Sequence, residues 1–270
     1  MSAFFLCFGQ IMLYTLGVIV ICGLLVEVCY QLCFSLMGRR ATRVVWIATG
    51  LIGTPMHELG HAIMCLLFGH RIERVRLWPT KGQGAMVEHS YHRKNPYASF
   101  GNIWIALGPI FAGLGVMAMI LRLVYPQTFA DMSSSFSQTL QQGSILTLLQ
   151  HEVGGWIRGL WNEQTRSLGW RIAAVVIMLS MSLHVRLSLA DVKGMLRGLP
   201  VYAVLAAVLA AVMVWMGTAA QQAMLGVLLR LAWMIVLLFS LIMIFALSLF
   251  VILFVFSLFV RLIVFFFGHS

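Results

Sequence analysis

Charged residues are scarce in this chain. Asp, Glu, Lys and Arg make up 10% of its 270 residues. In a typical soluble domain they account for about a quarter of the residues. Hydrophobic residues make up 61% of the sequence, and the mean hydropathy is +0.96. This composition excludes an ordinary soluble domain and predicts a protein embedded in a membrane.

Signals of secretion, redox chemistry and nucleic-acid binding are also missing. The N-terminus has no basic start and no clear small-residue cleavage site, so residues 4–37 predict a retained span rather than a removed signal peptide. The five cysteines lie in or beside apolar segments without a CxxC pair, which favours a packing role. The net charge of +10 fits basic residues that flank membrane spans and contact lipid headgroups. We therefore expect membrane lipids, and no nucleic acid, as partners.

Long apolar runs dominate the rest of the chain. A helix needs about 20 predominantly apolar residues to cross a bilayer. Six apolar blocks stand out, at about residues 4–37, 43–69, 99–125, 168–188, 199–217 and 224–267. The sixth block is too long for one ordinary span, so it predicts either a protruding helix or two spans joined by a turn.

The blocks together predict an all-α polytopic membrane protein with about six transmembrane helices. No internal repeat divides the chain. We expect a single membrane-embedded domain over residues 1–270, with a core at about 43–200. The N-terminal span at 4–37 and the C-terminal spans at 199–267 are then accessory to that core.

The two long connections between the blocks predict local structure of their own. In the basic connection after the second block, apolar residues alternate with arginines over residues 74–77, residues 78–82 are typical of a turn, and residues 85–87 are typical of a second strand. A short membrane-associated β-hairpin over 72–90 is therefore expected. In the polar connection after the third block, residues 145–160 favour an interfacial helix.

A polar cluster interrupts the second block, in the run His57-Glu58-Leu59-Gly60-His61. On a helix, residues i and i+4 project from nearly the same face, so His57 and His61 can bind one metal ion. Glu58 can then take a proton from a metal-bound water, and Gly60 keeps the helix surface low beside the metal. Imidazole and carboxylate ligands favour zinc. The alternative reading is a polar cluster that forms hydrogen bonds between helices.

A third metal ligand must come from elsewhere, and two residues near the end of the fourth block compete for this role. Asp191 is one of only two aspartates, and it lies next to a span, whereas Asp131 lies in a polar connection. His184 lies at a depth in its block similar to that of His57. We favour Asp191, whose alternative role is a helix cap or a flanking residue beside Lys193. The alternative role of His184 is a hydrogen bond between helices.

The remaining ionisable residues receive no role in catalysis. Glu27, in the first block, is expected to neutralise an arginine or to form a hydrogen bond with a neighbouring helix. We interpret the other histidines as solvated polar residues: His70, His89, His92, His151 and His269.

The HELGH run in a span, followed by a short strand-rich basic connection, resembles the site-2 protease-like family of intramembrane zinc metallopeptidases. Residues 106–113 look like the Gly-Pro element of that family, although Phe111 stands where an asparagine is usual and Asn102 lies one or two turns earlier. Residues 189–194 are similar in place to the family's Leu-Asp-Gly element, whose aspartate is the third zinc ligand. Val192 replaces the usual glycine there. The resemblance covers about 45–125 and 168–200.

The resemblance implies a zinc metalloendopeptidase that cleaves transmembrane protein substrates within or beside the membrane. Zn²⁺ would be held by His57, His61 and Asp191, or by His184 as the third ligand, and Glu58 would act as the base. The hairpin over 72–90 would offer an edge to an extended substrate. The expected location is the plasma membrane of a prokaryote. The rival functions are a divalent-metal carrier or other non-proteolytic metal-binding membrane protein, and an interaction protein with a degenerate site.

Overall fold

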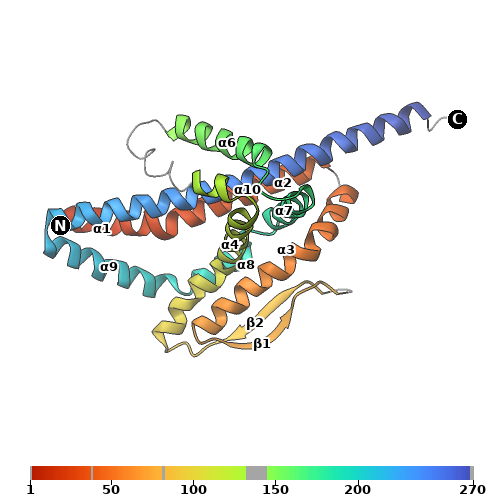
Figure 1. The fold of residues 1–270 in the computed structure, drawn as a ribbon. Helices are drawn as coiled ribbons and strands as arrows, with labels where there is room; N and C mark the ends of the chain where they lie inside the picture. The colour runs from red at the N-terminus through yellow and green to blue at the C-terminus, as the bar shows by residue number, and fades with distance from the viewer. Residues whose placement is uncertain (1, 38, 81–82, 132–144, 268–270) are drawn as a thin grey trace.

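The computed structural model describes residues 2–37, 39–80, 83–131 and 145–267, and these are mainly helical. Figure 1 shows long helices crossing one another, with a small hairpin below them. The elements are α1 (Ser2–Met12), a π-helical turn (Leu13–Gly17), α2 (Val18–Met37), α3 (Arg39–Leu67), β1 (Arg71–Arg76), β2 (Met86–Ser90), α4 (Pro96–Val124), α6 (Ile145–Asn162), α7 (Leu168–Ser182), α8 (Leu189–Met195), α9 (Leu199–Met216) and α10 (Thr218–Phe267).

The helices follow the predicted apolar blocks, and the expected all-α polytopic fold is confirmed. Within the described residues, four helices are long and apolar enough to cross a membrane: Ser2–Met37, Pro96–Val124, Leu199–Met216 and Thr218–Phe256. The motif helix α3 carries more polar residues than these four, and α7 is a shorter apolar helix of 15 residues. The expected total of six crossings therefore stays a prediction.

The sixth apolar block forms one continuous helix. α10 runs for 50 residues without a turn, which decides between the two alternatives that the sequence left open. Figure 1 shows this helix passing the rest of the bundle and projecting beyond it toward the C-terminus. The helix predicted around residues 145–160 is likewise present, as α6.

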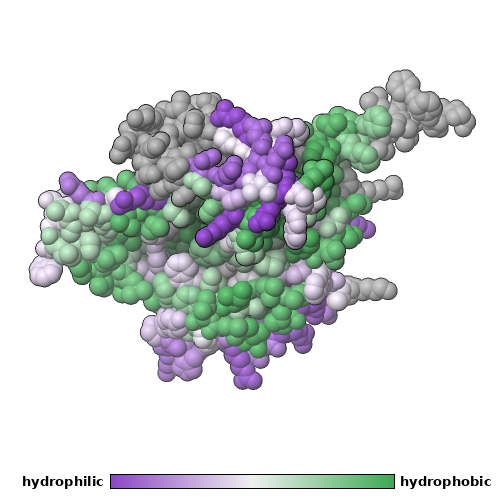
Figure 2. Space-filling view, viewed as in Figure 1, coloured by the Kyte–Doolittle hydropathy of each residue, from purple (hydrophilic) through white to green (hydrophobic). Residues whose placement is uncertain are grey.

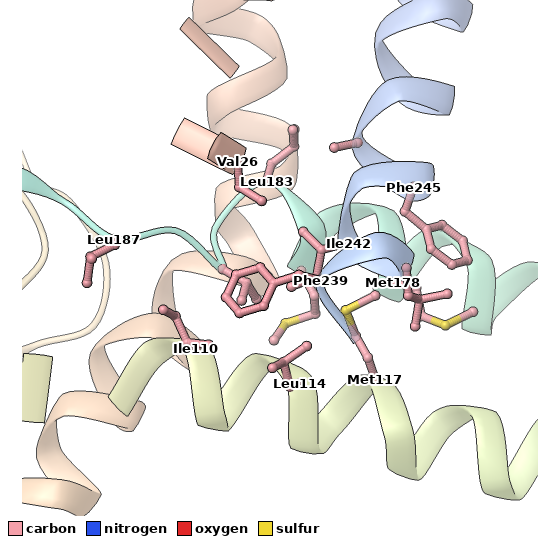
Figure 3. Packing of buried hydrophobic residues seen from close by; sticks show 14 of the residues in the cluster. Val26, Ile110, Leu114, Met117, Met178, Leu183, Leu187, Phe239, Ile242 and Phe245 are labelled. Atoms are coloured by element: carbon pink, nitrogen blue, oxygen red, sulfur yellow. The ribbon is translucent and has the colours of Figure 1, made fainter. Parts of the chain in front are cut away.

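The main core forms around α4. Figure 3 shows Ile110, Leu114 and Met117 along one side of α4, facing side chains from α2, α7 and α10. Their labelled partners in this cluster include Val26, Met178, Phe239, Ile242 and Phe245. Between apolar helices in a membrane, close van der Waals packing supplies most of the attraction. α2 and α10 contribute to this core, so the expectation that the spans at 4–37 and 199–267 are accessory stays a prediction.

The chain between α7 and α8 crosses the core without forming a helix. Two glycines make room for it: a Cβ atom on Gly23 of α2 would lie 3.3 Å from Leu187, and one on Gly113 of α4 would meet Val185. Small residues of this kind let neighbouring backbones approach closely. The non-helical segment leads directly to α8, and so it fixes where the residues of α8 lie.

The β-hairpin predicted over 72–90 is present. β1 and β2 pair in antiparallel fashion, with Val75 opposite Val87 and an irregularity between Ile72 and Arg74. Trp78, in the connection between the strands, donates its Nε1 proton to the carbonyl oxygen of Leu51 at 3.2 Å and so ties the hairpin to α3. In Figure 2, hydrophilic residues gather at the lower edge, where Figure 1 places the hairpin, and apolar residues cover much of the helices.

Candidate metal centre

The site begins where α3 and α4 cross. A Cβ atom added to Gly60 would lie 2.5 Å from the carbonyl oxygen of Gly108 and 2.7 Å from the nitrogen of Pro109. The two backbones therefore touch at this point, and only glycine allows it. Gly60 was expected to keep the helix surface low beside a metal, but the surface that lies against it is α4. The Gly-Pro element thus serves as the contact surface for the motif helix.

Three predicted ligand residues meet beside this crossing. His57 and His61 from α3 and Asp191 from α8 each offer one donor atom, and these atoms all lie within 4.8 Å of one another. The His61 Nε2 atom is 3.3 Å from Asp191 Oδ1. The three side chains are half-buried. In the described part of the chain, this is the one group of His, Cys, Asp or Glu residues with such spacing.

Backbone carbonyl groups orient both histidine rings. The Nδ1 atom of His57 lies 2.8 Å from the carbonyl oxygen of His184, and the Nδ1 atom of His61 lies 2.7 Å from that of Ile105. A carbonyl oxygen can only accept, so each Nδ1 must carry the proton. Each neutral ring then keeps its Nε2 lone pair for the cluster. Metal-binding histidines are commonly held by such a bond from the other ring nitrogen.

The two carboxylate oxygens of Asp191 have different partners. Oδ2 accepts from the Ser188 backbone N–H at 2.9 Å and from the Ser188 hydroxyl at 2.5 Å, while Ser188 Oγ accepts from the Asp191 N–H at 3.2 Å. These bonds form a capping box at the start of α8. The helix-cap role weighed for Asp191 is therefore present, and it leaves Oδ1 directed at His61.

The arrangement favours a positive charge between its members. With the proton on Nδ1, the Nε2 atom of His61 and the Oδ1 atom of Asp191 both act as acceptors, yet they are only 3.3 Å apart. Two ligands of a tetrahedral zinc ion with bonds of about 2.0–2.1 Å are themselves roughly 3.3 Å apart. The donor set and its spacing therefore fit a small dication.

His184, the alternative third ligand, has its ring elsewhere. Its Nδ1 lies 3.0 Å from the carbonyl oxygen of Ser180, and its ring meets Trp46 edge-on with 4.5 Å between centroids. Its buried Nε2 has no hydrogen-bond partner among the described residues. His184 thus reaches the cluster through its backbone carbonyl, which orients His57, and the structure groups Asp191 with the two motif histidines.

Glu58 and the cluster share one cavity of about 330 Å³. Glu58 is only 7% exposed. No described residue forms a hydrogen bond with its carboxyl group. The cavity also reaches β2 and α8, and its lining residues include Ala85, Met86, Val87, His89, Asn102, Ser188 and Arg197. The carboxyl group is thus free to meet a molecule that enters beside the histidines.

Asn102 lines the cavity, and its role was left open on the sequence alone. It is buried, and its Nδ2 donates to the carbonyl oxygen of Ser99 at 3.0 Å, which leaves the amide oxygen available. Phe111, at the usual asparagine position, instead packs against Trp104 with 5.8 Å between ring centroids. The sequence signal that could have found it is an amide inside an apolar span, one or two turns before the Gly-Pro element.

The interpretation of His70 as a solvated residue is wrong. His70 is only 4% exposed, and its Nε2 lies 2.8 Å from the carbonyl oxygen of Ala98. Its Nδ1 lies 2.9 Å from Nδ1 of His89, which lines the cavity. A turn between the helix and the hairpin brought the two together, and sequence spacing gives no sign of this. The side chain of His151 and all of His269 lie outside the described residues.

Glu27 has the partner expected of it. The Arg186 guanidinium donates through Nη1 to both carboxylate oxygens, at 3.2 and 3.1 Å, and also lies over the Trp46 ring at 4.8 Å from its centroid. Arg186 belongs to the segment that crosses the core between α7 and α8. The ion pair therefore joins α2 to the segment that carries His184 and leads to Asp191.

Comparison with known proteins supports the same reading. A family model described as Peptidase M50B-like matches residues 18–130. This match relates residues 18–130 to the site-2 protease-like family. The match to this family runs from α2 to just beyond α4, so it includes the HELGH run and the Gly-Pro element but ends before Asp191. The family match and the four apolar helices support a multi-pass integral membrane protein of the metalloprotease type. No curated protein and no solved structure matched the chain.

Proposed function

We propose that this protein is an intramembrane zinc metalloendopeptidase that hydrolyses peptide bonds of membrane-embedded or membrane-proximal proteins. One observation carries the proposal: the donor atoms of His57, His61 and Asp191 lie within 4.8 Å of one another, in the cavity that Glu58 also lines. A shared cavity is what a hydrolytic metal site requires, because the base must reach the water that attacks the substrate.

Zinc is the metal that suits these residues. His57 and His61 would hold it through Nε2 and Asp191 through Oδ1, a two-histidine, one-carboxylate set of the kind found in catalytic zinc sites. When bound, zinc supplies a Lewis acid that polarises a carbonyl group and lowers the pKa of water toward about 7. The bonds from Ile105, His184 and Ser188 keep the three side chains aimed at one point.

Glu58 is the general base and then the general acid. Its carboxylate takes a proton from the water that attacks the scissile carbonyl and delivers it to the leaving amine. The absence of a competing hydrogen bond from the described residues leaves both carboxylate oxygens free for this role. Burial between helices limits the water around it, so that the proton passes to the substrate.

The substrate binds in an extended form. A transmembrane helix hides its peptide groups, so it must unwind before a scissile carbonyl can meet the site. Residues Ala85, Met86 and Val87, at and before the start of β2, line the cavity, and an extended peptide can add to the hairpin as a further strand. The substrate is then a transmembrane protein, in a lipid bilayer that is the plasma membrane of a prokaryote.

A single variant tests the proposal. Glu58→Gln keeps the size of the side chain and leaves the three metal-binding residues intact, so we expect full zinc content and no proteolysis. The assay is cleavage of transmembrane substrates by purified protein in liposomes, with zinc measured in the same samples. Full cleavage by the variant contradicts the proposal. A metal carrier would bind and move zinc equally well without Glu58.

A further inference from the structure

Two histidines connect the start of α4 with the wall of the cavity. His70 Nε2 lies 2.8 Å from the Ala98 carbonyl oxygen, and His70 Nδ1 lies 2.9 Å from His89 Nδ1. The buried His70 ring also stacks on Tyr91, with 4.7 Å between centroids. His89 lines the cavity of the metal centre. A continuous chain of polar contacts therefore runs from the backbone of α4 to this cavity.

The partners fix the protons along this chain. The Ala98 carbonyl oxygen accepts, so His70 Nε2 carries a proton and the Nδ1 of a neutral His70 has a lone pair. His89 must then donate from Nδ1. The remaining nitrogen of a neutral His89, Nε2, is left as an acceptor. It has no hydrogen-bond partner among the described residues.

The His89 ring favours the neutral form in this setting. Burial, together with the nearby His70, His61 and Arg197, lowers the pKa of His89 to about 4. His70 is 4% exposed, and within the described residues no carboxylate pairs with it. A buried cation without a counter-charge is costly. The chain of contacts through His70 and His89 therefore presents a hydrogen-bond acceptor, and not a donor, beside the metal centre.

An extended peptide in this cavity needs such an acceptor. Its backbone N–H groups leave water on binding, and each one without a partner weakens binding. We infer that His89 is a substrate-binding residue whose Nε2 accepts a hydrogen bond from a backbone N–H of the bound peptide, and that His70 is the residue that positions it. This inference rests on the proposed function, because it takes a peptide as the ligand.

A double-mutant cycle between protein and ligand tests the inference without requiring turnover. The probe is a dipeptide hydroxamate, which joins a zinc-binding group to two backbone amides. Two analogues each replace one amide by an ester and so lack one N–H donor. Dissociation constants are measured by calorimetry on zinc-loaded protein in detergent, for the wild type and for His89→Phe, His70→Phe and His92→Phe. The exposed His92 lies outside the cavity lining and serves as the matched control.

We expect one ester analogue to bind the wild type about tenfold more weakly than the amide. His89→Phe should weaken binding of the amide by a similar factor and remove the difference in affinity between amide and ester, since the acceptor is gone. His70→Phe should remove most of it, and His92→Phe should leave it unchanged. A general distortion of the hairpin would weaken binding of the amide and of the ester equally, and the difference in affinity between them would remain.

The outcomes separate this inference from the proposed function. If the hydroxamate binds the wild type, but neither ester shows a difference that depends on His89, the inference is overturned and the proposed function stands. If the hydroxamate does not bind the zinc-loaded wild type at all, the proposed function fails, and the inference falls with it.

Discussion

Replacing Gly60 with alanine is expected to push α3 and α4 apart at the metal centre. The new Cβ atom would lie 2.5 Å from the carbonyl oxygen of Gly108 and 2.6 Å from its carbonyl carbon. Both atoms are backbone, so no side-chain rotation relieves the contact. Because real Cβ atoms stay at least 3.0 Å from other atoms, the helices must separate by about half an ångström.

The size of the effect follows from this movement. Overpacking between well-fitted elements costs about 1–3 kcal/mol. The separation also strains the hydrogen bond between His61 of α3 and the Ile105 carbonyl of α4, which is 2.7 Å long. A misplacement of about 1 Å can lower an enzymatic rate by roughly 100-fold, so half that distance predicts a loss of about tenfold.

Two assays and one matched variant test this reasoning. Gly115 lies on α4 as well, but a Cβ atom there would meet nothing within 4 Å, so Gly115→Ala is the control. We expect Gly60→Ala to unfold at lower denaturant concentration, to hold zinc more weakly and to cleave more slowly, while Gly115→Ala matches the wild type. A Gly60→Ala protein with wild-type stability and zinc affinity would refute the backbone contact between α3 and α4.

Three further changes have defined outcomes. Asp191→Asn should lower zinc affinity by more than the roughly 10–100-fold that is typical when a partner supporting a metal ligand is replaced. His184→Phe keeps the backbone carbonyl and should retain zinc in equilibrium dialysis. Equal losses of zinc affinity in the two variants would contradict the assignment of Asp191. Arg186→Met removes the cationic partner of the Glu27 carboxylate, which then keeps only the hydrogen bond from Gln31, and should cost about 1–3 kcal/mol of unfolding free energy. Adding Glu27→Gln should restore part of this loss; if the second change adds a further loss, the two residues are not coupled. Although burial alone would raise the pKa of Glu163, hydrogen bonds from neighbouring backbone and hydroxyl groups hold this pKa below its ordinary value. Glu163→Gln should therefore lower the free energy of unfolding at pH values above the ordinary glutamate pKa, and the difference from the wild type should shrink as the pH falls through the lowered pKa. A difference in unfolding free energy that does not depend on pH would exclude this linkage.

The sequence predicted those parts of the fold that depend on local spacing. The i, i+4 spacing of His57 and His61 placed both rings on one helix face, and the alternation over residues 74–77 with a turn after it predicted the hairpin. α10 was ambiguous because a long apolar run contains no signal that separates one helix from two. In the structure it is one helix of 50 residues, which packs against α2 and α9 over part of its length.

The rest of the site depends on contacts between distant segments. Asp191 and His184 compete on sequence alone, since both lie near the end of one apolar block. The chain leaves the helix after Ser182, and this turns the His184 ring toward Trp46 and brings Asp191 to His61. The meeting of His70 with His89 likewise depends on the pairing of β1 with β2, which places His89 opposite Ile72.

Zinc binding by His57, His61 and Asp191 can be tested by an anomalous difference map at the zinc absorption edge, from crystals of the protein loaded with one equivalent of zinc. One peak is expected, bounded by Nε2 of His57, Nε2 of His61 and Oδ1 of Asp191, in the cavity that Glu58 lines. The absence of a peak at this position, or a zinc ion bound to the ring of His184 in place of Asp191, would contradict this expectation.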